Sequence, residues 1–328
     1  MITLKGNSMQ FRFPEVKQSA GCKVSFQRTL RIPDDNQSYS LPPSLGNFPL
    51  HHVDDFSNLS ENYEKRGGIF YPMYQSEAMW IRFSGRYPCA IKIAAGKINA
   101  VSGEAWSEGL NSDKQDYIVS DKQPWLDGFN VSKGMIRQFV AMPLGKGFTA
   151  EEQITREPEF GGLQIIVYPM KAEVYEKLYT GDVVRSMSMQ SYSAKIIECR
   201  DADMGLAAGG LMKQEIYQDL RGIDVWDTEN SSRCFIHIMN SNQYHDVTGS
   251  FPPTPPPSAK DYNEAGLPWF DYYNDNPSIK GSDVLKGLKS VGAKTIEDFD
   301  FSLDDNDSLK EKNIENLYEK KLIRGVVF

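Results

Sequence analysis

The sequence predicts a mainly β fold of the α+β class, with an antiparallel sandwich or barrel-like body and a small C-terminal helical appendix. Three observations lead to this prediction. Short segments alternate between apolar and polar side chains, as half-buried strands do. Glycine, proline, asparagine and aspartate separate these segments, as in antiparallel sheets. Helical periodicity is scarce before residue 170 and concentrates after residue 280.

The clearest predicted strand is Lys23–Ile32, where apolar residues such as Val24 and Phe26 alternate with polar ones. Arg28 alone interrupts its apolar face, and we expect it to reach a carboxylate or the rim of the sheet. The other predicted strands are Ala78–Ser84, Cys89–Ala95, Asp116–Val119, Met135–Met142, Leu163–Tyr168, Ala194–Cys199 and Arg233–Met239.

Three segments are predicted to be helical. Lys171–Tyr179 has the length of one short helix. Ser282 is placed as the N-cap of a second helix that ends at Gly292, and Ser308 as the N-cap of a third over Leu309–Leu322. The apolar positions that define these last two helices are Val284, Leu285, Leu288, Val291, Ile314, Leu317 and Tyr318.

The chain divides into three parts on composition. Residues 1–250 form a β-rich body, either one domain or two β subdomains that meet near residues 170–190. Residues 251–280 form a strap rich in proline and aromatic residues, and residues 281–328 form the helical tail. The tail has too few apolar residues for a core of its own, so we expect it to dock on the body.

The strap is the most informative stretch of the chain. Its prolines between Pro252 and Pro257 favour a stiff extended path. The aromatic residues Trp269, Phe270, Tyr272 and Tyr273 follow, and we take these four as the candidate binding residues. A stiff spacer that leads into an aromatic cluster either fastens the chain to its own body or offers a binding surface. We expect Trp269 or Phe270 to be mostly buried in the body.

The net charge and the absence of certain sequence patterns argue against several classes of protein. The net charge is −8 and the pI is near 5.2, which disfavours binding to nucleic acid or to an anionic membrane surface. The sequence has no long apolar run and no signal-peptide pattern at its start, so we expect a cytoplasmic protein. The four cysteines, Cys22, Cys89, Cys199 and Cys234, are dispersed and are expected to be reduced.

We expect neither a bound metal nor a cofactor. The densest group of potential ligands is HHVDD at residues 51–55, where His52 and Asp54 would share one face of a strand. No second segment supplies a third ligand, so a solvated loop is the favoured interpretation. The glycine-rich run 204–212 lacks both phosphate-binding patterns, which favours tight turns or close backbone approach. The acidic run 298–307 lacks the central glycine of a calcium loop, and its acidic residues have the wrong spacing.

Catalytic residues are only weakly indicated. His237 lies in an apolar segment and is expected to be a buried, hydrogen-bonded imidazole. His245 is followed by Asp246, and Ser241 would share a helix face with it, but no nucleophile elbow accompanies them. A glycosidase needs a pair of carboxylates on either side of its substrate. Six glutamates flank predicted strands near aromatic residues and are candidates for such a pair: Glu104, Glu108, Glu151, Glu152, Glu157 and Glu159.

The sequence therefore predicts a non-catalytic cytoplasmic binding or assembly protein that uses an aromatic-rich surface, with a protein or a second copy of itself as partner. The alternative is a hydrolase that acts on a carbohydrate or peptide-like substrate through Asp and Glu residues or His245.

Six strings stand out together: FQRTLRIPDD, QPWLDG, RQFVAMPLGKG, EEQITREPEFGGLQI, MGLAAGG and GLPWFDYY. On these strings the chain resembles a family of uncharacterised bacterial proteins of unknown function, over most of residues 23–275. The resemblance implies no activity, cofactor or catalytic residue.

Overall fold

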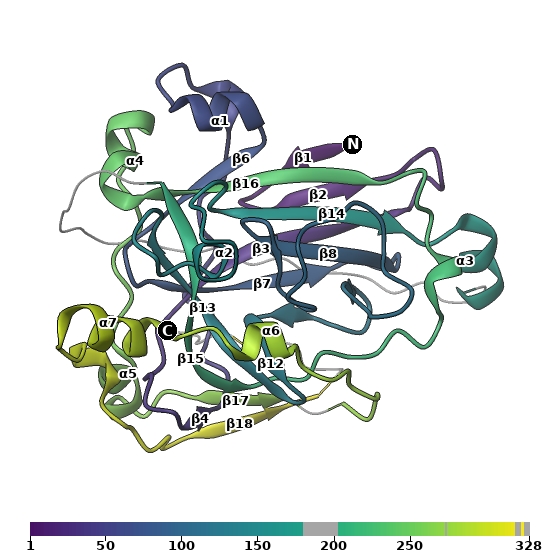
Figure 1. Cartoon of the computed structure of the whole chain (residues 1–328). Coiled ribbons are helices and arrows are strands. Elements are labelled where there is room, and N and C mark those ends of the chain that lie inside the picture. Colours follow the sequence, from purple (N-terminus) through teal and green to yellow (C-terminus); the bar gives the residue numbers. More distant parts are fainter. Residues whose placement is uncertain (180–202, 273, 319–322, 325–328) are drawn as a thin grey trace.

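The computed structural model is mainly β and describes residues 1–179, 203–272, 274–318 and 323–324 (Figure 1). Sixteen strands form one large, mostly antiparallel sheet with the path β1-β2-β3-β7-β13-β15-β16-β14-β8-β10, and six short strands branch from it. The described strands do not close into a barrel. The prediction of a mainly antiparallel β body is confirmed.

The strands of this sheet are β1 (Ile2–Leu4), β2 (Met9–Arg12), β3 (Gly21–Thr29), β4 (Ser38–Tyr39), β5 (His51–His52), β6 (Ile69–Met73), β7 (Ala78–Ser84), β8 (Cys89–Ala95), β9 (Ile98–Asn99), β10 (Ile118–Val119), β11 (Trp125–Leu126), β12 (Gly128–Ser132), β13 (Met135–Pro143), β14 (Leu163–Pro169), β15 (Met204–Lys213) and β16 (Ser232–Asn240). A separate two-stranded sheet pairs β17 (Trp269–Tyr272) with β18 (Ile314–Leu317).

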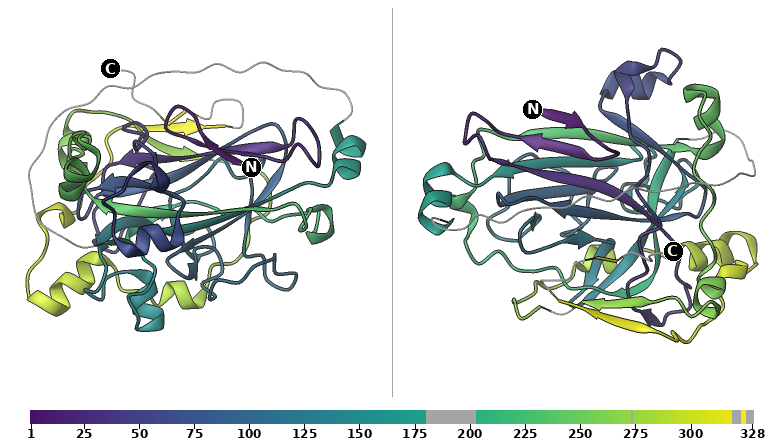
Figure 2. Two further views of the ribbon diagram at one scale, coloured as in Figure 1. Left: turned by 90° about the horizontal axis from the view of Figure 1, so that it is seen from above. Right: turned by 180° about the vertical axis from the view of Figure 1, so that it is seen from behind.

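The helices are α1 (Glu61–Arg66), α2 (Ala150–Thr155), α3 (Ala172–Tyr179), α4 (Ser241–Thr248), α5 (Ala259–Glu264), α6 (Asp283–Lys286) and α7 (Val291–Phe299). Single 3₁₀ turns are η1 (Val53–Asp55), η2 (Ile223–Val225) and η3 (Asp304–Asn306). Helices α1 and α4 lie at the same end of the body, and α3 lies at the opposite side (Figures 1 and 2). No helix in these described ranges is long and apolar enough to cross a membrane.

Most predicted strands form where the alternation places them. In β3, Val24 and Phe26 are fully buried, and Arg28 reaches the buried carboxylate of Glu77, with 2.8 Å between Nη2 and Oε1. The segment predicted as Asp116–Val119 shortens to β10, and α3 confirms the helix predicted at Lys171–Tyr179. The strand predicted at Ala194–Cys199 lies outside the described residues.

The glycine-rich run is a strand, so the prediction of tight turns there is wrong. It forms β15, which pairs with β13 over most of its length. The prediction of close backbone approach is confirmed, because a Cβ added at Gly210 would clash with the backbone carbonyl oxygen of Pro33. The run has no β-branched residue, so its composition carries none of the usual strand preference. Its buried position in the sheet decides its conformation instead.

The tail departs most from the prediction. Ser282 caps α6 as expected, but this helix has only one turn, and Ser290 caps a second helix, α7, that runs through Gly292. The helix predicted over Leu309–Leu322 is also wrong in its described part, where β18 pairs in parallel with β17. The Trp269 amide donates to the carbonyl of Asn313 at 2.8 Å, and this tertiary pairing overrides the local helical pattern.

The tail shares its core with the body. Leu285 and Leu288 belong to the largest buried cluster, which also contains residues of β2, β3, β8 and β14. Val291 packs in a second cluster with Ala78 and Phe148. The N-terminus of α7 is fixed as well, because the Gly292 amide donates to Oδ2 of Asp34 at 2.8 Å.

Candidate functional site

The strap is fastened to the body at both of its ends. Near its start, Nη2 of Arg28 donates a hydrogen bond to the carbonyl of Thr254. Near its end, the backbones of Leu41 and Phe270 exchange hydrogen bonds of 2.8 and 2.9 Å. Trp269 is fully buried, and its Nε1 donates to Oδ1 of Asn263 at 3.2 Å. The prediction that Trp269 or Phe270 is buried in the body is confirmed.

The four candidate binding residues have different positions. Trp269 and Phe270 are buried in two different clusters and hold the strap in place. Tyr272 is half-buried and lies at the surface end of the cluster that contains Phe270. Tyr273 lies outside the described residues. Of the four, Tyr272 is the one that the structure places beside a pocket.

This pocket, which we call the Trp125–Tyr272 pocket, has a volume of about 420 Å³. Its aromatic wall consists of Trp125 from β11 and Tyr272 from β17, whose rings meet edge to face with centroids 5.2 Å apart. Its polar wall comes from Arg82 on β7 and from Asp121 and Lys122 in the loop before β11. The arrangement combines an aromatic surface with charged groups, as many ligand pockets do.

The charges of this pocket are unevenly paired. Asp121 is engaged, because Arg221 Nη1 donates to its Oδ1 at 3.0 Å. The side chains of Arg82 and Lys122 have no hydrogen-bond or ion-pair partner among the described residues. Partial burial, and then the charge of Arg324, lower the pKa of Arg82. The pocket therefore holds two uncompensated cations, and an anion would be attracted to it.

A buried arginine lies behind the aromatic wall. Arg324 donates to both carboxylate oxygens of Asp127, at 2.8 and 2.6 Å, and both side chains are almost completely buried. The Arg324 guanidinium lies 4.2 Å from the ring centroid of Trp80 and 5.0 Å from that of Trp125. Sequence reasoning missed this group, because the two charged residues are 197 positions apart.

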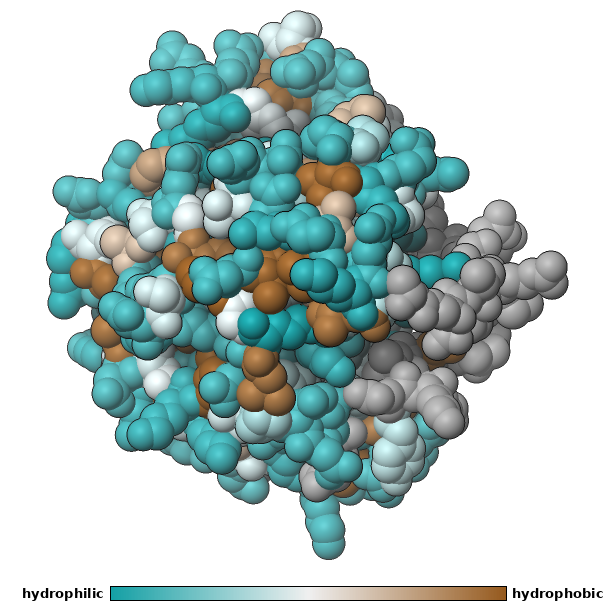
Figure 3. Space-filling view, turned by 90° about the vertical axis from the view of Figure 1, so that its right-hand side faces the viewer, coloured by the Kyte–Doolittle hydropathy of each residue, from teal (hydrophilic) through white to brown (hydrophobic). Residues whose placement is uncertain are grey.

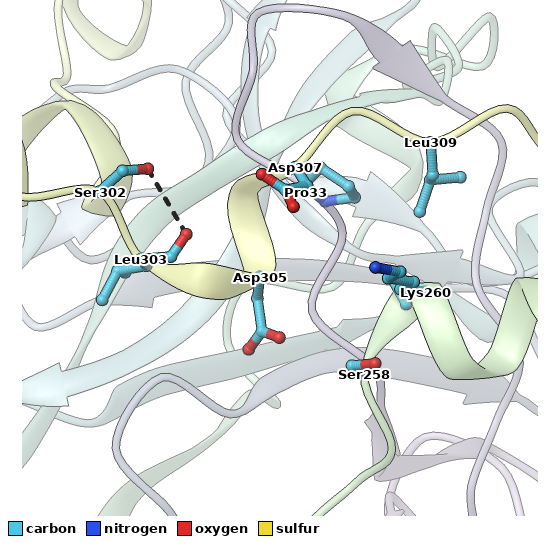
Figure 4. A pocket seen from close by; sticks show the side chains of 9 residues that line it. Pro33, Ser258, Lys260, Ser302, Leu303, Asp305, Asp307 and Leu309 are labelled. Atoms are coloured by element: carbon cyan, nitrogen blue, oxygen red, sulfur yellow. Dashed lines mark hydrogen bonds between the residues drawn. The ribbon is translucent and has the colours of Figure 1, made fainter.

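A second pocket, of about 450 Å³, lies where the tail meets α5 (Figure 4). Lys260 comes from α5, and Asp305 and Asp307 come from η3 and the residue that follows it. Nearby, Arg31 is buried and donates to Oδ1 of Asn306 at 2.9 Å, while its Nε and Nη1 have no partner in the described part of the chain. The charges of this pocket are mixed in sign, so it has no clear preference for an anion or a cation.

The histidines do not form a catalytic group within the described residues. His237 is buried, with Nε2 3.0 Å from the Gly67 carbonyl, which confirms the predicted buried imidazole. His245 is exposed and stacks on Phe251 at 4.6 Å. Ser241 lies one turn earlier on α4, but its hydroxyl is buried and has no partner among the residues that the structure describes.

The HHVDD segment is not a simple solvated loop, so that interpretation is wrong for its histidines. They form β5, and Nε2 of His51 lies 2.6 Å from the hydroxyl of Tyr244. The His51 ring also stacks on Phe70, with centroids 5.3 Å apart. Over the described ranges, no three His, Cys, Asp or Glu side chains are grouped closely enough to hold a metal ion.

The six glutamates considered for glycoside hydrolysis have structural contacts. Glu152 completes the capping box of α2 with Thr149, and Glu151 accepts hydrogen bonds from the amides of Phe160 and Gly161. The other four form ion pairs, Glu104 with Lys114, Glu108 with Arg233, and Glu157 and Glu159 with Lys97. Each carboxylate has a local partner, and no two of them face a common pocket among those described.

Figure 3 shows one face of the molecule, on which small hydrophobic areas are separated by hydrophilic residues. Several of the hydrophobic residues gather in a band across the middle of this face, which hydrophilic residues interrupt. No protein-family model matches the chain, and no curated protein or solved structure matches it either.

Proposed function

We propose that this chain is a non-catalytic binding protein and that its Trp125–Tyr272 pocket takes an anionic group carried on a flat ring. The observation that supports this proposal is the pair of uncompensated cations, Arg82 and Lys122, beside an aromatic wall. A partner protein can present an anion and a flat ring together, as an acidic residue beside an aromatic one, and we propose a protein as the natural partner.

The expected energies favour a ligand that uses both walls. A hydrogen bond to a charged group contributes about 1.5–3 kcal/mol, and an aromatic pair adds about 0.5–1.5 kcal/mol beyond its buried area. A ligand with only an anion or only a ring would use half of the site. The anchored strap supports the proposal further, because Phe270 holds the neighbouring Tyr272 in place before any ligand arrives.

We also propose that the protein works in the cytoplasm. Cys22, Cys89 and Cys234 are buried free thiols, while Cys199 lies outside the described residues. Unpaired buried thiols are typical of a reducing compartment.

Calorimetric titration with phenyl phosphate tests the binding proposal, with phenol and inorganic phosphate as the two half-ligands. We expect phenyl phosphate to bind at least about tenfold more tightly than either half-ligand. The double substitution Arg82→Gln and Lys122→Gln should remove most of this advantage, and Tyr272→Ala should reduce it.

The control is Lys260→Gln, which removes one cation from the other large pocket and should leave binding unchanged. Equal affinity for phenyl phosphate and phenol would contradict the proposal, and so would binding that survives the double substitution. A peptide with adjacent acidic and aromatic residues, titrated in the same way, separates a protein partner from a small aromatic anion.

A further inference from the structure

The proline run of the strap, residues 251–257, is exposed where it connects α4 to α5 along one side of the body (Figure 1). It forms neither a helix nor a strand. Phe251 is 68% exposed, and Pro255 and Pro257 are exposed as well, whereas Pro252 is buried. One side of the run therefore rests on the body, while its other side is open to a partner.

Covalent geometry fixes the conformation of this run. Each proline holds its own φ near −65° and moves the residue before it into the extended region. Five residues of the run directly precede a proline, and none of its peptide bonds is cis. These restraints together favour a polyproline II helix, which needs no hydrogen bonds of its own.

Both ends and the middle of the run are fixed to the protein. Gly249 ends α4 in the left-handed conformation, and the side chain of Ser258 caps α5 by accepting a hydrogen bond from the Asp261 amide at 3.1 Å. Between these ends, Arg28 donates to the carbonyl of Thr254. The run is thus ordered before any partner arrives, so that binding would cost little further conformational entropy.

The exposed side of the run is apolar and uncharged. The ring of Phe251 is held by stacking on His245, with centroids 4.6 Å apart, and still remains mostly exposed. Residues 247–259 contain no charged side chain, although the whole chain has a net charge of −8. Nucleic acid and anionic membranes both need cations, so neither suits this run. A partner would have to recognise its shape and its apolar rings.

We propose that residues 251–257 are a docking site for a partner domain whose groove is lined with aromatic side chains. Grooves of this kind, as in SH3, WW and EVH1 domains, bind proline-rich segments because the polyproline II helix is already formed. The exposed rings of Phe251 and Pro255 would pack against the aromatic walls of the groove. No residue of the run lines the Trp125–Tyr272 pocket, so this surface is separate from the binding site proposed above.

Calorimetric titration of the full chain with one SH3, one WW and one EVH1 domain tests this proposal. We expect at least one of these domains to bind. Phe251→Ala and Pro255→Ala should each weaken that binding by about tenfold or more, because each removes an apolar ring from the contact. Both residues are exposed, so the melting temperatures of the two variants should stay close to that of the parent.

Pro14→Ala is the matched control, since Pro14 is an exposed proline outside the strap, and it should leave binding unchanged. A peptide of residues 249–260 should bind the same domain no more tightly than the full chain does, because the folded chain already holds the run in place. If none of the three domains binds the full chain, the proposal is overturned. The same conclusion follows if the peptide binds and the full chain does not, or if binding survives both Phe251→Ala and Pro255→Ala.

Discussion

Buried charges link residues that are far apart in the chain. Arg28 pairs with Glu77 and Lys92 with Asp116, at 2.8 and 2.7 Å, and Arg324 pairs with Asp127. A buried ion pair contributes little net stability compared with well-packed apolar residues, but the loss of one partner leaves an uncompensated charge. These pairs therefore fix which segments meet, since any other pairing of segments would bury a charge alone.

The Arg324–Asp127 pair gives the sharpest prediction at this scale. Arg324→Met keeps the apolar length of the side chain but leaves the buried Asp127 carboxylate without its counter-ion. We expect the free energy of unfolding, measured with urea, to fall by about 3–5 kcal/mol. Lys289→Met breaks the exposed pair with Glu297 and should cost about 0–1 kcal/mol. Equal effects from the two substitutions would show that Asp127 is not held by Arg324.

His237 makes the stability dependent on pH. Burial lowers its pKa to about 4, whereas an unfolded histidine has a pKa near 6.5. Between these values the unfolded chain binds a proton that the folded chain does not bind. The contribution of His237 to the free energy of unfolding is therefore complete above about pH 6.5. It is lost as the pH falls toward 4, and the total loss is about 3 kcal/mol.

Urea unfolding at several pH values from 4 to 7 measures this effect. His237→Gln should reduce the slope of the free energy of unfolding against pH by an amount that corresponds to up to about one bound proton. This holds whatever the substitution does to stability at pH 7. His245→Gln, which replaces an exposed histidine, is the matched control. A slope that is the same in all three proteins would contradict a buried neutral imidazole at position 237.

At the scale of elements, the strap depends on Trp269. Its ring is fully buried against Tyr262, which it meets edge to face at 5.8 Å. Trp269→Ala should lower the free energy of unfolding by about 3–5 kcal/mol, because it leaves a large cavity. Tyr272→Ala, three residues later and half-buried, should cost clearly less. If both substitutions cost the same, the strap is not anchored by the buried ring.

The sequence identifies elements well where side-chain pattern and burial agree. The strands around Phe26, Trp80 and Ile165 follow from alternation or from apolar runs, because one or both faces of each strand are buried. The helix expected around Ile314 does not form, because its conformation depends on pairing with β17 more than forty residues away. The strap prediction placed Trp269 correctly, since a bulky ring after a stiff proline segment has few stable positions other than the core.

The pockets were less predictable. Tyr272 was a candidate from composition alone, but Arg82 and Trp125 join it only because β7 and β11 pair in the sheet. Proximity of this kind is set by the path of the chain, which local periodicity does not contain.

At the scale of the whole molecule, body, strap and tail share buried clusters. Leu317 of the tail packs with Phe270 of the strap and with Trp80 and Trp125 of the body. Leu285 and Leu288 join the largest cluster of the body. Each fully buried side chain of this size contributes about 1.5–3 kcal/mol, so the tail contributes several kcal/mol in total. That sum is comparable to the whole stability of an ordinary domain, about 5–15 kcal/mol.

Deletion of residues 281–328 should therefore leave a chain that aggregates or melts at a markedly lower temperature. The truncation uncovers the apolar surface beneath Leu285 and Val291 and removes the counter-ion of Asp127 at the same time. Thermal unfolding and light scattering of the truncated and full chains measure the effect, and a separate peptide of residues 281–328 should restore part of the stability. Ile296→Ser is the control, because Ile296 is 51% exposed on the outer face of α7 and should change little. A truncated chain that stays monomeric with an unchanged melting temperature would mean that the body folds without the tail, which would then act as a detachable arm for a partner.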